Sequence, residues 1–102
     1  MKLNVLERIV ASQILPKEGS FTNLKLIRVT KEELSFTEEE NKALEFTQVG
    51  ERLNWKEGIV KDKEFNFGEV VTKLIVDKLK ELDKSEDLTE NHFSLYEKFI
   101  GE

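Results

Sequence analysis

The first part of the chain carries its apolar residues at helical spacing. Asn4 followed three residues later by Glu7 is typical of a capped helix start, and apolar residues then recur with helical spacing as far as Ile14. The pattern predicts a helix over about 4–14. Pro16 ends it, because the residue before a proline avoids the helical region.

Residues 22–34 are compatible with two structures. Leu24, Ile27 and Leu34 fall on one helical stripe, with Leu26 and Val29 beside it, whereas the segment 24–29 also fits a strand. The good helix formers at 31–34 favour a helix. The strand remains the open alternative.

The middle of the chain changes its period from helical to strand-like. Thr37 and Glu40 form a capping-box pair, which predicts a short helix over about 38–43. Apolar and polar residues then alternate on both sides of a turn at 49–51, which predicts a hairpin, and residues 63–67 read as a third strand. We therefore expect a small antiparallel sheet over about 44–67.

Helical spacing returns in the last third of the chain. It predicts a long helix over about 69–83 and a final helix over about 90–100, with Leu88 and Phe93 placed as a hydrophobic staple around Thr89. The final helix is apolar on more than one side, so it either folds across the core or presents a protein interface. The candidate interface residues are Leu95, Tyr96, Phe99 and Ile100.

Together these elements predict an α+β fold in one domain over 1–102. Three N-terminal helices, the small antiparallel sheet and two C-terminal helices give a winged-helix-like order. We expect one face of the sheet to pack on the long helix. The predicted sheet residues are Leu44, Phe46, Leu53, Trp55, Phe65 and Phe67, and the predicted helix residues are Val70, Val71, Leu74, Ile75 and Leu79.

Three stretches carry a resemblance to a known group of proteins. The segments 15–21 (LPKEGSF), 32–40 (EELSFTEEE) and 88–99 (LTENHFSLYEKF) resemble small hypothetical proteins of bacteriophages and prophages. The likeness extends over nearly the whole chain. It implies a phage or prophage origin and action in the cytoplasm of a bacterial host, and it brings no catalytic or binding residues with it.

Composition narrows the function classes. The chain has 102 residues with 16 Lys and Arg against 21 Asp and Glu, a net charge of −5, and no Cys. The lack of Cys excludes disulfides, thiolate metal sites and Cys nucleophiles. Apolar runs are far shorter than the roughly 20 residues that a membrane helix needs, and no export signal is evident. We expect a cytoplasmic protein that does not enter a membrane.

Candidate chemistry is sparse. His92 is the only His and is expected to lie exposed or to pack at the cap of the last helix. Adjacent carboxylates at Glu38, Glu39 and Glu40 point in different directions on a helix, so capping explains them. Motifs for calcium, nucleotide or acyl-transfer sites are missing from the sequence. No catalytic residue, metal or cofactor is predicted.

Three functional hypotheses remain. The first is a noncatalytic accessory protein of a phage or prophage that binds itself or another protein, of phage or host. The alternative is a winged-helix-like DNA-binding regulator that uses Lys17, Lys25, Arg28 and Lys31. The third is an acidic inhibitor or nucleic-acid mimic of a host protein, because residues 37–102 carry −7. The acidic net charge disfavours a nucleic-acid partner.

Overall fold

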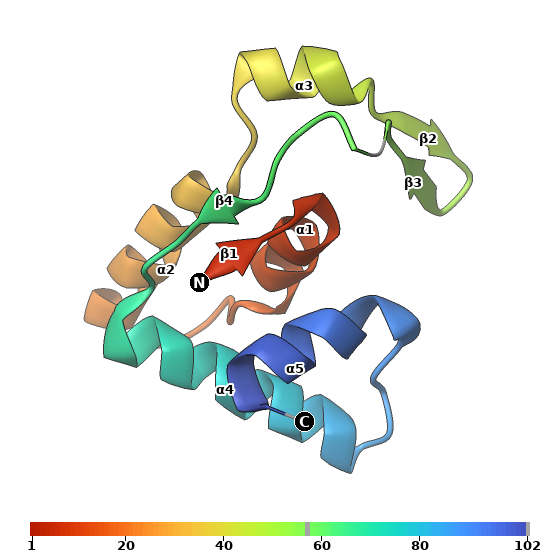
Figure 1. The fold of residues 1–102 in the computed structure, drawn as a ribbon. Coiled ribbons are helices and arrows are strands. Elements are labelled where there is room, and N and C mark those ends of the chain that lie inside the picture. Colours follow the sequence, from red (N-terminus) through yellow and green to blue (C-terminus); the bar gives the residue numbers. More distant parts are fainter. Residues whose placement is uncertain (57, 102) are drawn as a thin grey trace.

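The computed structural model describes residues 1–56 and 58–101, and the fold is α+β (Figure 1). Its helices are α1 (Val5–Ile14), α2 (Phe21–Leu34), α3 (Glu38–Leu44), α4 (Gly68–Lys84) and α5 (Phe93–Ile100), and a 3-10 turn, η1 (Glu90–His92), precedes α5. The strands are β1 (Lys2–Leu3), β2 (Thr47–Val49), β3 (Arg52–Asn54) and β4 (Lys63–Glu64). The predicted fold class and the positions of all five predicted helices are confirmed.

Helix α1 lies in the middle of the molecule, in contact with α2, α4 and α5 (Figure 1). The predicted cap is present, because the Asn4 side chain accepts from the Glu7 amide at 2.8 Å and Glu7 accepts from the Asn4 amide at 2.9 Å. Val10 and Ala11 are buried against residues of α2, α4 and α5. The core therefore surrounds α1.

Residues 21–34 are helical, which decides between the two structures that the sequence allowed. The Ser20 hydroxyl caps α2 by accepting from the Asn23 amide at 3.1 Å. Only Ile27, Thr30 and Leu34 of this helix are buried. Helix α2 therefore contacts the body of the protein along one narrow stripe and leaves most of its circumference accessible.

The predicted three-stranded sheet is wrong. Strand β4 pairs with β1 in antiparallel register, Lys2 opposite Glu64, while β2 and β3 form a separate hairpin. The amide of Phe65 also donates to the Met1 carbonyl at 2.8 Å. A strand of two residues is too short to show an alternating pattern, so β1 could not be predicted from the sequence. With two separate sheets, the winged-helix likeness is only approximate.

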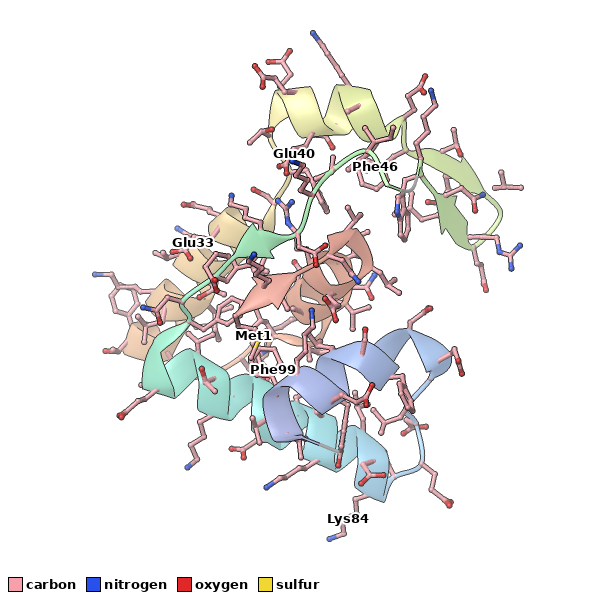
Figure 2. All side chains as sticks on the ribbon, viewed as in Figure 1. Met1, Glu33, Glu40, Phe46, Lys84 and Phe99 are labelled. Carbon is pink, nitrogen blue, oxygen red and sulfur yellow. The ribbon has the colours of Figure 1, made fainter. Side chains whose placement is uncertain are left out.

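The hairpin does not pack on α4, which corrects the predicted core. Phe46 and Trp55 are half-buried and meet edge to face, with ring centroids 6.1 Å apart. Figure 2 shows Phe46 near the hairpin and far from α4. Leu53 is exposed, and Leu44 is buried as the last residue of α3.

The remaining predicted core residues lie close to α4 and α5. Phe65 is buried and stacks on Phe67 with centroids 5.6 Å apart, and Phe67 meets Phe99 of α5 at 5.8 Å. On α4, the core residues are Val71, Ile75 and Leu79, with Leu74 partly buried, whereas Val70 is exposed. The helical half of the predicted core is thus confirmed except at Val70.

Among the helices of residues 1–56 and 58–101, none combines the length and apolar character needed to cross a bilayer.

Candidate functional site

A buried arginine fixes the position of α2 and α3. Arg8 of α1 is 1% exposed, and its guanidinium donates to both carboxylate oxygens of Glu40, at 2.8 and 3.2 Å. It also donates to the Leu34 and Ser35 carbonyls, at 3.3 and 2.7 Å, and lies 4.1 Å from the ring centroid of Phe36. One side chain therefore hydrogen-bonds both to the carbonyl groups at the end of α2 and to the carboxylate in the first turn of α3.

The carboxylate of Glu40 is the counterpart of this arginine. It lies below the first turn of α3, on the side of β4 and α1 (Figure 2). The hydrogen bonds from Arg8 lower the pKa of Glu40 from 4.5 to about 2, and the Thr37 amide adds to the effect. Glu40 is therefore ionised at neutral pH and keeps the buried guanidinium neutralised.

A second buried charge joins α1 to α5. The Glu7 carboxylate is fully buried, and its Oε1 accepts from Lys98 Nζ at 2.7 Å. Lys98 Nζ also donates to the Lys2 carbonyl at 2.7 Å. Burial raises the pKa of Glu7, but the hydrogen bonds from Lys98 and the Asn4 amide outweigh it and hold the pKa below its ordinary value. Both buried pairs fasten helices together, which is a structural role.

Helix α2 carries the largest concentration of exposed apolar side chains on one helix. We call its four exposed apolar residues the outer surface of α2; they are Phe21, 77% exposed, Leu24, 37%, Leu26, 38%, and Val29, 51%. Phe21 and Val29 are eight residues apart, so they lie on the same side of the helix. Lys25 lies between them, its Nζ 5.6 Å from the Phe21 ring centroid.

A hollow beside this surface gathers three of the four cations that the DNA-binding hypothesis named. Its volume is about 520 Å³, and it lies between the α1–α2 loop and one side of α2. Lys17, Arg28 and Lys31 line it, whereas Lys25 lies outside it. The hollow's other lining residues are Pro16, Leu24, Ile27, Glu32 and Ser35. We call it the basic hollow.

The interface expected on the last helix offers less exposed apolar surface than α2 does. Leu95 is fully buried in the core, so it is not available to a partner. Tyr96, Phe99 and Ile100 are half-buried and pack against the same core. Phe93, which was not among the candidate interface residues, is 64% exposed. This helix therefore covers the core with most of its apolar residues.

His92 lies at the cap of the last helix, as expected. Its Nδ1 accepts from the Thr89 amide at 2.9 Å. In the part of the chain that the structure describes, no three His, Asp or Glu side chains are grouped so that they could hold a metal ion.

A second concave region separates the hairpin from α1. Two hollows of about 510 and 710 Å³ share Leu6, Trp55 and Asn91 in their linings. Their charged lining residues are Lys56 with Asp62 in one and Arg52 with Glu51 in the other. Because these charges balance, the region shows no preference for the charge of a ligand, in contrast to the basic hollow.

Sequence reasoning missed Phe21, Leu26 and Val29 as accessible residues. The signal was present, since Leu26 and Val29 fall beside the predicted apolar stripe of residues 22–34 rather than on it. A helix with more apolar residues than one stripe holds must leave some of them exposed.

Comparison of the chain with protein-family models, with curated proteins and with solved structures finds no match.

Proposed function

We propose that this protein is a noncatalytic accessory module that acts by binding another protein, and that the outer surface of α2 makes the contact. The observation that supports the proposal is the exposure of four large apolar side chains on one helix of 14 residues. Scattered single apolar residues are normal on a protein surface, whereas several on one accessible helix, with Phe21 and Val29 on the same side, are typical of an interaction site.

The same surface is held rigidly, which favours binding. Ile27, Thr30 and Leu34 anchor the inner side of α2, and Arg8 holds the carbonyl of its last residue. A helix already ordered in the free protein loses little conformational freedom on association. Full burial of a side chain such as Phe21 or Val29 contributes about 1.5–3 kcal/mol, so a few anchors give a specific complex.

The test compares two matched pairs of substitutions. Phe21→Glu with Val29→Glu alters the outer surface of α2, and Phe93→Glu with Val49→Glu makes the same changes at similarly exposed positions elsewhere. All four positions are accessible, so both double variants are expected to keep the circular dichroism spectrum of the parent.

Binding is measured by affinity capture from a bacterial lysate with quantitative mass spectrometry, and self-association by sedimentation velocity. We expect at least one protein, or a second copy of this chain, to bind the parent and the control variant and to be lost with the α2 variant. If the α2 variant keeps every captured protein and the oligomeric state of the parent, the proposal is refuted.

We also propose that the module comes from a bacteriophage or prophage, on the strength of the resemblance in segments 15–21, 32–40 and 88–99. Genome neighbourhood tests this origin. Flanking genes for capsid, tail or host-takeover proteins would support it, and a setting of unrelated chromosomal genes would contradict it.

A further inference from the structure

The basic hollow combines an apolar floor with cations from two segments. Pro16 and Lys17 come from the loop after α1, and Leu24, Arg28 and Lys31 come from successive turns of α2. Positions 24, 28 and 31 are four and three residues apart, so they share one side of the helix. The hollow therefore offers an apolar strip bordered by positive charge.

Within the described residues, the cations of the basic hollow form no ion pair with a carboxylate of the protein. In the structure of residues 1–56 and 58–101, Arg8 is paired with Glu40, Lys98 with the buried carboxylate of Glu7, and Lys56 with Glu45. The ion pairs of the same residues include none made by Lys17, Arg28 or Lys31. Glu32 is the one carboxylate in the lining. The hollow thus has an excess of two positive charges on a protein of net charge −5.

We propose that the basic hollow binds an acidic, amphipathic segment of the partner protein; this inference rests on the proposed function. Aliphatic side chains of that segment lie on Leu24 and Ile27, and its carboxylates pair with Lys17, Arg28 and Lys31. The guanidinium of Arg28 has the fork geometry that a carboxylate accepts in two hydrogen bonds. Charge complementarity of this kind selects the partner and speeds its association.

A protein segment fits this surface better than nucleic acid does. Leu24 lines the hollow beside the cations, and Phe21 is exposed next to Lys25 on the same helix; phosphate groups would leave the apolar area of both side chains in water. The first turn of α3 carries three Glu side chains, so this helix is not suited to the major groove.

The experiment selects ligands from a displayed library of random 16-residue peptides on the immobilised full chain. The most enriched peptides are synthesised with a fluorescent label, and their affinity is measured by anisotropy at two salt concentrations. We expect selected peptides to be rich in Asp and Glu interleaved with Leu, Ile or Phe. Their Kd should rise several-fold between low and physiological salt, because charge pairs at a surface are screened.

Matched charge reversals locate the contact. Arg28→Glu and Lys17→Glu should each raise the Kd of the selected peptides at least tenfold, whereas Arg52→Glu on the hairpin and Lys80→Glu on α4 should change it less than twofold. All four side chains are exposed, so folding is retained. A random duplex DNA pool is tested in parallel at low salt.

Three results overturn the inference: no enriched peptide, enriched peptides without acidic bias, or equal effects of Arg28→Glu and Arg52→Glu. Tighter binding of duplex DNA than of any peptide, lost with Arg28→Glu, overturns it in favour of a nucleic-acid partner. If the inference fails while Phe21→Glu with Val29→Glu still abolishes partner capture, the proposed function stands with a different partner chemistry. If both fail, α2 is not the contact.

Discussion

The ion pair between Arg8 and Glu40 makes a sharp prediction about stability and pH. Glu40→Gln keeps the size of the side chain and its acceptor oxygen for the Thr37 amide. It removes the charge that neutralises Arg8, together with one of the two oxygens that accept from the guanidinium. A pKa lowered from 4.5 to about 2 corresponds to about 3 kcal/mol. The Glu40 side chain is 20% exposed, so solvent screening reduces the expected loss to about 1–2 kcal/mol.

The pH dependence follows from the direction of the shift. The folded-state pKa of Glu40 lies below its unfolded value, so the stabilisation is complete above about pH 4.5 and disappears as the pH falls toward 2. We expect the difference in free energy of unfolding between the parent and Glu40→Gln to be constant from pH 7 to 5. By about pH 3 the difference should fall to half or less.

Glu39→Gln is the matched control. Both carboxylates lie in the first turn of α3, so both substitutions lose the same attraction to the helix dipole, and Glu39 is exposed. Urea titrations followed by circular dichroism and by Trp55 fluorescence measure both variants between pH 7 and 3. A pH-independent difference, or equal destabilisation by the two substitutions, would refute the assigned role of Glu40.

Two further substitutions test the packing by urea unfolding. Lys98→Gln leaves the buried carboxylate of Glu7 without its cation and should lower the free energy of unfolding by about 1–3 kcal/mol, a range that allows for the 35% exposure of Lys98. The exposed control Lys80→Gln should lower it by less than about 0.5 kcal/mol, and equal losses would contradict the role of Lys98. Phe65→Ala should lower the free energy of unfolding by about 3–5 kcal/mol because the residue is 4% exposed, whereas Trp55→Ala, at a half-buried ring, should lower it by about 1–2 kcal/mol. A larger loss for Trp55→Ala than for Phe65→Ala would place the hairpin in the core.

Local signals explain what could be predicted. The capping boxes at Asn4 and Thr37 depend on residues three positions apart, and both form with the expected hydrogen bonds. Pairing of Lys2 with Glu64 depends on residues far apart in the chain, and no period in the sequence encodes it. Antiparallel strands that follow one another usually pair, and here the N-terminus takes the place of the hairpin beside β4.

The residues of the candidate site also divide into those that local sequence signals predict and those that depend on contacts far apart in the chain. Lys17, Arg28 and Lys31 were named from the sequence because they cluster within 15 residues, but only the turn of the chain at Pro16 brings Lys17 to the side of α2. The buried roles of Glu7 and Arg8 were not predicted. Their partners lie 91 and 32 residues away in the chain, and charged residues are ordinarily exposed unless they are paired.

The two buried ion pairs bear directly on which partner the surface attracts. Residues 1–36 contain six cations and four carboxylates, an excess of +2. Arg8 is neutralised by Glu40, and Glu7 is neutralised by Lys98. Both partners lie outside residues 1–36, so each pair neutralises one charge of this segment. One cation and one carboxylate are removed, and the excess of +2 persists on the accessible residues. Except for Lys2, every remaining charge of the segment lies at or beside α2: the cations at positions 17, 25, 28 and 31 and the carboxylates at positions 18, 32 and 33, a local excess of +1. Within α2 and its preceding loop, the hollow lined by Lys17, Arg28, Lys31 and Glu32 holds an excess of two positive charges, on the same helix that exposes Phe21 and Val29. A partner that binds both places on the helix is therefore expected to bring carboxylates to the hollow.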